Sequence, residues 1–179
     1  MTDQRATFGA GCFWCLEAAM NQLQGVTQAL SGYMGGHVNN PSYQAICTGQ
    51  TGHAEVVEVT FDPDIISYSQ LCQIFFSLHD PTQLNRQGND VGTQYRSVIF
   101  YHDAKQHSTA LEVIAELTNM KLFDAAIVTE VTAASEFYPA ESYHQGYANN
   151  NPNQGYCQFI ISPKLATFRQ RFSTLLKSN

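Results

Sequence analysis

The stretch AEVVEVTFDP, residues 54–63, constrains the fold more than any other, because its apolar and polar side chains alternate. Alternation is typical of a β-strand with one face against a core and the other toward solvent. Further strands are predicted at residues 5–10, 25–36, 97–102, 126–131 and 156–161. Helical spacing of apolar residues, with capping residues and a proline, predicts helices at residues 12–24, 67–78, 103–119, 141–151 and 163–177.

Several of these strands are only half apolar, and helices alternate with them along the chain. This arrangement favours an α+β two-layer sandwich over a fully buried parallel sheet. We expect a mixed, mostly antiparallel sheet with a ferredoxin-like core. Residues 37–54 and 79–96 are long loops rich in Gly, Asn and Tyr. Loops of this length are usually functional, so we expect an active site built on them.

The chain has 179 residues, of which 44% are hydrophobic and 13% charged, and its net charge is -6. This composition predicts a single globular domain over residues 1–179. No cluster of Lys and Arg is present, which argues against a nucleic-acid partner. No apolar run is long enough to span a membrane, and the N-terminus does not resemble a signal peptide. We therefore expect a cytoplasmic protein, and nothing in the sequence indicates an obligate oligomer rather than a monomer.

Cys12 is the first candidate for chemistry. It follows Gly-Ala-Gly at the predicted start of a helix, where free N–H groups and the helix dipole favour a thiolate. The alternative is a buried cysteine that acts as a small hydrophobic side chain. In a reducing compartment the five cysteines of this chain are not expected to be structural disulfides.

Cys12 and Cys15 also form a C-x-x-C pattern, which is compatible with half of a zinc site or a thioredoxin-like redox pair. The pattern does not recur and the histidines show no paired spacing, so we expect no metal. Phe13 and Trp14 fill the space between the cysteines, where a thioredoxin motif usually has Gly-Pro or Pro-His. These two aromatic side chains belong either to the core or to a pocket for a methyl or other apolar group.

Glu55 opens the alternating strand, on the same face as Val57 and Val59. A carboxyl group at the end of an apolar row has a raised pKa and can donate or accept a proton. The alternative is an ordinary exposed carboxylate. Asp90 and Tyr95 lie in the second long loop and Tyr43 in the first, where they are either solvated turn residues or ligands for a polar oxygen.

Five segments occur in order along most of the chain: GCFWC, SGYMGGHVNNPSY, TGHAEVVEVTFDP, HDPTQLNRQGNDVGTQYRS and YHQGYANNNP…GYC. In this combination the chain resembles the methionine sulfoxide reductase A family, which reduces the S epimer of methionine sulfoxide. The resemblance implies an α+β sandwich with a catalytic cysteine at the start of the first helix, and no cofactor.

Carried over residue by residue, the resemblance implies a role for each candidate. Cys12 is the nucleophile and Glu55 the acid that protonates the sulfoxide oxygen. Phe13 and Trp14 form the pocket for the methyl group of the substrate. The side chains that hold the oxygen and anchor the site are Tyr43, Tyr95 and Asp90. Attack by Cys12 yields methionine and a sulfenic acid, which a second thiol converts to a disulfide that thioredoxin reduces.

The second thiol is the least determined of these roles. The resemblance implies Cys157, because a cysteine in a C-terminal GYC takes this role in much of the family. In this chain a predicted strand and helix follow Cys157, in place of a flexible Gly-rich tail. Cys15 is the competitor, although a bond to Cys12 requires local unwinding of the helix. Cys47 in the first loop stays open, and Cys72 is expected to lie in the core.

Two other classes of function fit parts of the pattern. One is a thiol–disulfide oxidoreductase that uses Cys12 and Cys15 as its redox pair. The other is a module that binds oxidised peptides without turnover.

Overall fold

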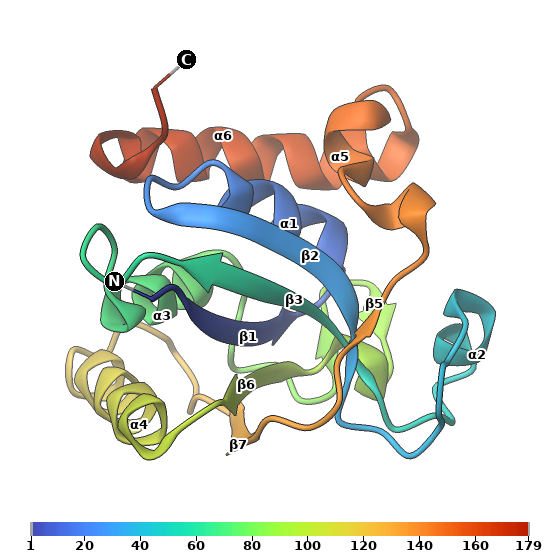
Figure 1. The fold of residues 1–179 in the computed structure, drawn as a ribbon, viewed down its shortest axis with the longest axis horizontal. Coiled ribbons are helices and arrows are strands. Elements are labelled where there is room, and N and C mark those ends of the chain that lie inside the picture. Colours follow the sequence, from blue (N-terminus) through green and yellow to red (C-terminus); the bar gives the residue numbers. More distant parts are fainter. Residues whose placement is uncertain (1, 179) are drawn as a thin grey trace.

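The computed structural model describes residues 2–178 and is built around a six-stranded sheet (Figure 1). The strands of this sheet are β1 (Gln4–Ala10), β2 (Val26–Met34), β3 (Ala54–Phe61), β6 (Ser97–Tyr101), β7 (Glu130–Ala133) and β8 (Tyr138–Pro139). A separate two-stranded ribbon consists of β4 (Arg86–Gln87) and β5 (Asp90–Val91). The helices are α1 (Phe13–Asn21), α2 (Tyr43–Cys47), α3 (Tyr68–Ser77), α4 (Ala104–Asn119), α5 (Tyr147–Asn150) and α6 (Ser162–Arg171).

The sheet has the strand order β7-β6-β1-β3-β2-β8. The pairs β1–β3, β1–β6, β2–β3 and β2–β8 are antiparallel, and β6–β7 is parallel. This confirms the predicted α+β fold with a mixed, mostly antiparallel sheet. In the β2–β3 register Glu55 lies opposite Tyr33, so the predicted acid is held within the sheet.

The two faces of the sheet are covered differently, and β3 shows this best. Val57, Val59 and Phe61 are fully buried in the main core, which the helices complete. Ala54 and Val56 belong to a smaller cluster, against which the partly buried Ala134 and Phe137 pack. The predicted strand therefore has apolar residues buried on both of its faces. The helices α1 and α6 lie together on one side of the sheet (Figure 1).

Three of the helices, α2, α3 and α4, begin at capping residues that the sequence makes recognisable. Ser67 and Gln70 form a reciprocal capping box at α3, and the Asp103 carboxylate accepts a hydrogen bond from the Gln106 N–H at the start of α4. The helix α1 differs, because its N-cap is Cys12 and no side chain caps it. Its first N–H group is therefore available to a residue of the site, and the Phe13 N–H donates to Glu55.

Three predicted segments were wrong in type or position. Residues 156–161 are not a strand: the chain is helical there, with a wide π-turn at Cys157–Ile161 that runs into α6. An apolar run of this length is compatible with a strand or a helix. Here every fourth residue is buried, at Cys157, Ile161 and Leu165, which is the spacing of a helix. The strand predicted at 126–131 starts later, at Glu130, and the helix predicted at 141–151 is split by Gly146 in the left-handed conformation.

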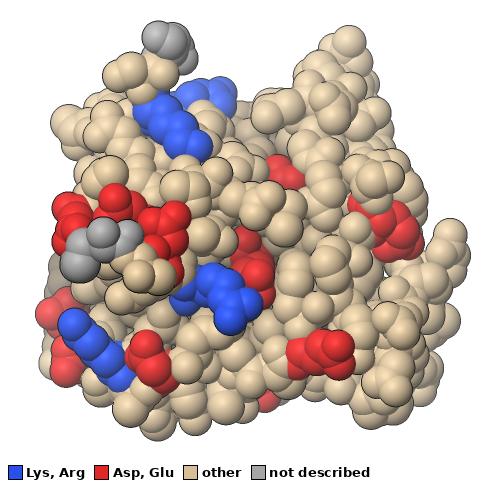
Figure 2. Space-filling view, viewed as in Figure 1, with Lys and Arg blue, Asp and Glu red and all other residues tan. Residues whose placement is uncertain are grey.

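Within residues 2–178, no helix combines the length and the apolar character needed to cross a membrane. Figure 2 shows sparse charged side chains of both signs mixed over the visible face.

Candidate functional site

Cys12 lies at the junction between β1 and α1, with the extended backbone angles of an N-cap residue (φ −62°, ψ 125°). Gly11 before it has φ +82°, and a Cβ there would come within 2.8 Å of the Gln87 Cβ. The glycine is therefore required both for the turn and for the close approach of the β4 ribbon. Cys12 itself is half-buried and its thiol is free.

Glu55 is buried, with 2% of its surface exposed. Its Oε1 accepts a hydrogen bond of 3.2 Å from the Phe13 N–H, at the free N-terminus of α1. Burial raises the pKa of Glu55 to about 8, the Phe13 N–H opposes this rise, and the charge of Asp90 adds to it. The carboxyl is therefore largely protonated at neutral pH, beside the backbone of the cysteine.

The expected stabilisation of a Cys12 thiolate is outweighed in the resting site. Burial raises the pKa of Cys12 well above its ordinary value, and the neighbouring Glu55 charge raises it further. The Trp14 N–H lowers it, as the helix N-terminus predicts, but by less. When Glu55 is protonated it no longer repels a negative charge on the Cys12 sulfur, so the titrations of Glu55 and Cys12 depend on each other.

Tyr43 and Tyr95 bring their hydroxyls to the same region from different loops. Tyr43 begins α2, and Tyr95 ends a 3₁₀ turn at Thr93–Tyr95. Burial raises the pKa of both phenols, and in each case the Glu55 charge is the next contribution. Both side chains are thus near Glu55 and remain hydrogen-bond donors at physiological pH.

Asp90 is held by a residue that the sequence analysis did not single out. Its Oδ2 accepts a hydrogen bond of 2.6 Å from the Tyr156 hydroxyl. The charges of Cys12 and Asp90 both raise the pKa of Tyr156, after burial. Tyr156 therefore connects the β5 ribbon with the C-terminal segment beside the cysteine.

Phe13 and Trp14 have different surroundings. Phe13 is buried, with its ring centroid 5.7 Å from that of Tyr33. Trp14 stacks on Tyr147 at 3.9 Å between centroids, and its Nε1–H donates a 3.0 Å hydrogen bond to His144 Nδ1. Burial lowers the pKa of His144, so the neutral ring that accepts this bond prevails at neutral pH.

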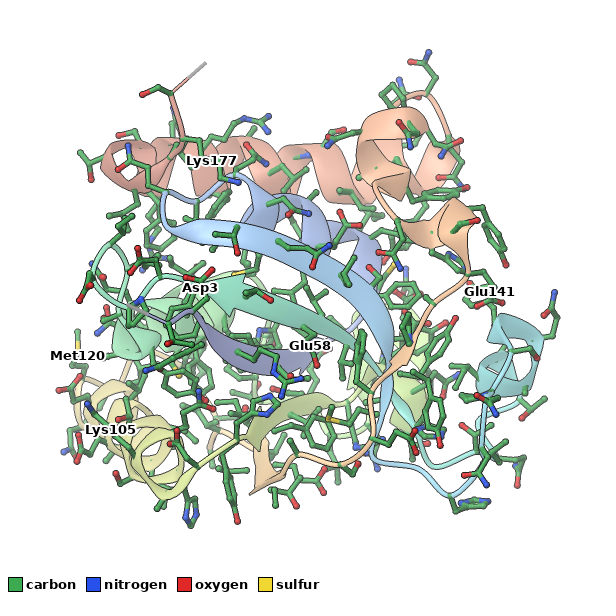
Figure 3. All side chains as sticks on the ribbon, in the orientation of Figure 1. Asp3, Glu58, Lys105, Met120, Glu141 and Lys177 are labelled. Carbon is green, nitrogen blue, oxygen red and sulfur yellow. The ribbon has the colours of Figure 1, made fainter. Side chains whose placement is uncertain are left out.

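The segment that carries His144 is tied to the rest of the molecule at both ends. Glu141 accepts hydrogen bonds from the Tyr33 hydroxyl and from the Tyr43 N–H, and it lies on the segment between the sheet and α5 (Figure 3). The Gly146 N–H donates to the buried carboxylate of Glu17 in α1. The YHQGY motif, quoted above only for the resemblance, is thus the part that closes the aromatic side of the site.

The remaining cysteines are distributed over different environments. Cys15 is 9% exposed, Cys157 is 1% exposed in the core, and Cys47 is exposed at the end of α2. Cys72 is fully buried in the core, which confirms the prediction. Among residues 2–178 no three His, Cys, Asp or Glu side chains are grouped so that they could hold a metal ion.

Comparison with known proteins gives a consistent result. The family model described as "Peptide methionine sulfoxide reductase" matches residues 4–176. The chain is 56% identical over 175 residues to the peptide methionine sulfoxide reductase MsrA of Chromobacterium violaceum, covering 98% of this chain and 99% of that protein. The reduced form of Mxr1 from Saccharomyces cerevisiae is similar in structure, with a TM-score of 0.80, 32% identity and coverage of 87% and 90%.

Mxr1 in complex with Trx2 also shares the fold of this chain. The TM-score is 0.56, the identity is 22%, and the match covers 82% of this chain and 85% of that one.

Proposed function

The chain belongs to the peptide methionine sulfoxide reductase family and is an enzyme that reduces methionine sulfoxide; we propose that Cys12 is its nucleophile and Glu55 its acid. One observation supports this assignment above the others. A buried carboxyl with a pKa of about 8 accepts the N–H of Phe13, the residue directly after the cysteine. A protonated acid is thereby kept beside a thiol at neutral pH.

In the proposed first step Glu55 donates its proton to the sulfoxide oxygen while the Cys12 sulfur attacks the sulfoxide sulfur. Protonation turns the oxygen into a better leaving group, which lowers the barrier to attack on a weak electrophile. The S–O bond of the sulfoxide then breaks, its oxygen passes as hydroxide to the Cys12 sulfur, and the bond between the two sulfurs breaks. The products are methionine and a sulfenic acid on Cys12, and the proton that Cys12 loses restores the acid form of Glu55. Tyr43 and Tyr95 donate hydrogen bonds to the same oxygen.

The proposed stereochemistry follows from the placement of two unlike walls. The aromatic wall of Phe13 and Trp14 accepts the methyl group, and the hydroxyls and Glu55 accept the oxygen. A sulfoxide sulfur carries three different groups, so only one of its two epimers places the methyl group and the oxygen on these walls while exposing the sulfur to Cys12, and we propose that it is the S epimer, which the family resemblance implies. Asp90, held by Tyr156, is the second polar anchor for the substrate.

The catalytic cycle is completed by a second thiol of this chain and an external reductant. The sulfenic acid condenses with the second thiol to a disulfide and water, and a dithiol then reduces the disulfide. We propose thioredoxin as this reductant, and the complex of the similar protein Mxr1 with Trx2 supports it. The proposed site of action is the cytoplasm, and the proposed unit is one domain acting as a monomer.

The test is a single turnover without reductant. Fully reduced protein is mixed with excess L-methionine-(S)-sulfoxide or its R epimer, and the methionine released per chain is measured. The proposal requires about one methionine per chain from the S epimer only, with loss of two free thiols.

Glu55→Gln and Cys12→Ser are the informative variants, and Glu112→Gln, an exposed position in α4, is the matched control. Glu55→Gln is expected to slow methionine release by roughly 10²–10⁴-fold, the usual contribution of a general acid. Release at the wild-type rate from Glu55→Gln, or any release from Cys12→Ser, would contradict the assignment.

A further inference from the structure

Cys12 faces a second space besides the one with Glu55 and the tyrosines. This cavity has a volume of about 260 Å³ and lies between the start of α1, the β4 ribbon and the C-terminal helical segment. The described residues that line it include Cys12, Cys15, Gln87, Tyr156 and Lys164, and most of the others are apolar. Two of the five cysteines therefore share one small, mostly apolar cavity.

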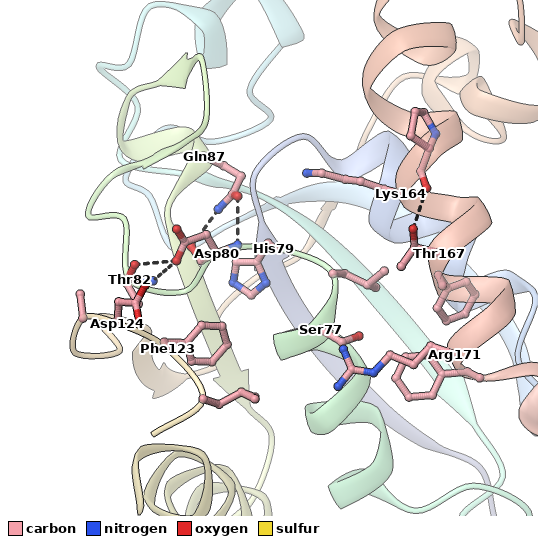
Figure 4. A pocket seen from close by; sticks show the side chains of 16 residues that line it. Ser77, His79, Asp80, Thr82, Gln87, Phe123, Asp124, Lys164, Thr167 and Arg171 are labelled. Carbon is pink, nitrogen blue, oxygen red and sulfur yellow. Dashed lines mark hydrogen bonds between the residues drawn. The ribbon is translucent and has the colours of Figure 1, made fainter. Parts of the chain in front are cut away.

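Lys164 is the one charged residue among those described lining residues. It lies in the first turn of α6 and is half-buried. It also lines a larger neighbouring pocket of about 650 Å³, together with His79, Asp80 and Arg171. Figure 4 shows the Lys164 side chain reaching from α6 toward the loop that carries Gln87.

The environment of Cys15 explains why a cation matters at this place. A thiol attacks a sulfenic acid as the thiolate, so its proton must leave. Burial raises the pKa of Cys15 to about 11, and the Lys164 charge lowers it against that rise. In an apolar cavity a nearby ammonium group stabilises the thiolate more strongly than it would in water.

The other cysteines do not share this environment. Cys157 is 1% exposed within the core and does not line the cavity. Cys47 is exposed at the end of α2 and does not line it either. Of these three cysteines, only Cys15 therefore shares this cavity with Cys12.

We propose that Cys15 is the recycling thiol of this reductase and that Lys164 is the positioning residue that stabilises its thiolate. The inference rests on the proposed function, because a sulfoxide must first oxidise Cys12. The Cys15 thiolate attacks the sulfur of the Cys12 sulfenic acid, an S–S bond forms, the S–O bond breaks, and hydroxide leaves as water with one proton. The Cys15 sulfur is oxidised and the Cys12 sulfur reduced, so the sulfoxide supplies the whole oxidising equivalent.

The geometry places this pair at the N-terminus of a helix, where Cys-x-x-Cys pairs are known to exchange between dithiol and disulfide. Cys12 is outside the helix as its N-cap, so the first turn of α1 needs only a local opening for the two sulfurs to meet. This choice differs from Cys157, which the resemblance implied.

The experiment separates methionine release from disulfide formation. Reduced wild-type protein and the variants Lys164→Met, Lys164→Arg, Arg171→Met and Cys15→Ser are mixed with excess L-methionine-(S)-sulfoxide without reductant. Samples are quenched with dimedone, which traps sulfenic acid, and the peptides are analysed by mass spectrometry. Arg171→Met is the matched control, because Arg171 lies on the same helix and lines only the larger pocket.

In Lys164→Met we expect methionine release to precede a disulfide that forms more slowly, by about three- to fourfold for each unit by which the thiol pKa rises, because the thiolate fraction falls about tenfold while the remaining thiolate becomes a better nucleophile. Trapped sulfenic acid on Cys12 accumulates meanwhile. Raising the pH should restore the rate in this variant, since hydroxide then deprotonates Cys15. Lys164→Arg keeps the charge and should retain most of the rate, and Arg171→Met should match the wild type. Cys15→Ser should hold the sulfenic acid.

Other titratable and charged groups also lie near this pair and contribute to the pH profile of disulfide formation. Those around Cys15 and Lys164 are Cys12, Tyr156, His79, Asp80, Asp124 and Arg171. A disulfide that forms in Lys164→Met with the wild-type rate and pH profile would overturn the role of Lys164. A disulfide to Cys157 or Cys47 in the wild type would overturn the role of Cys15. No methionine from the wild type would overturn the proposed function itself, and this inference with it.

Discussion

Substituting Glu55 by Gln should stabilise the fold at neutral and alkaline pH although it removes the proposed acid. The pKa of Glu55 is raised from 4.5 to about 8 in the folded protein. Between these values the folded state holds a proton that the unfolded state has lost. Stability therefore falls as pH rises through this window, because folding must either take up the proton or bury a charge.

The size of the effect follows from the shift. Each unit of pKa difference corresponds to about 1.4 kcal/mol, so the loss between pH 5 and pH 8 is on the order of 3–4 kcal/mol, as an upper value. Gln cannot titrate and its carbonyl oxygen can still accept the Phe13 N–H. The stability of Glu55→Gln should therefore change less with pH than that of the wild type.

The assay is urea unfolding of wild type, Glu55→Gln and the exposed control Glu112→Gln at pH 5, 6, 7 and 8. We expect the difference between wild type and Glu55→Gln to grow in favour of the variant as pH rises, while Glu112→Gln follows the wild type. Parallel curves for wild type and Glu55→Gln would refute the reasoning, because Glu55 would then have the same pKa in both states.

Three further outcomes follow from the site. The rate of methionine release should decline above about pH 8 as Glu55 loses its proton, and a pH–rate profile without this decline would contradict its role. His144→Phe should weaken substrate binding and cost about 1–3 kcal/mol of stability, because the Trp14 N–H loses its acceptor. The KM reports the change in binding, and the fluorescence of the single Trp during unfolding reports the change in stability. Gly11→Ala should destabilise the fold by more than about 1 kcal/mol and lower activity, since φ is +82° and the new Cβ would contact Gln87; thermal unfolding and turnover test this.

Local patterns determined much of the fold. The alternation at 54–61 set the central strand, and the Ser67 and Asp103 caps set the starts of α3 and α4, because these signals act over a few residues. The same kind of signal predicted Glu55 on the core face of its strand. The family resemblance then supplied the candidate roles, from motifs that are specific only in combination.

What the sequence left ambiguous depends on contacts between distant segments. The run at 156–161 fits strand or helix by composition, and only the packing of Cys157, Ile161 and Leu165 at every fourth residue makes it helical. The spacing of four residues from Cys157 to Ile161 and on to Leu165 is visible in the sequence, and it predicts one helix that continues through Pro163.

Other features had no local signal at all. The hydrogen bond between Trp14 and His144 joins residues 130 positions apart, and the burial that raises the Glu55 pKa exists only once α1 packs on the sheet. The cavity shared by Cys15 and Lys164 likewise requires α6 to lie beside α1. The sequence by itself thus determined the elements and the reactive groups, because both are encoded locally. The tertiary structure decided their ionisation and pairing, because desolvation and proximity come only from the folded chain.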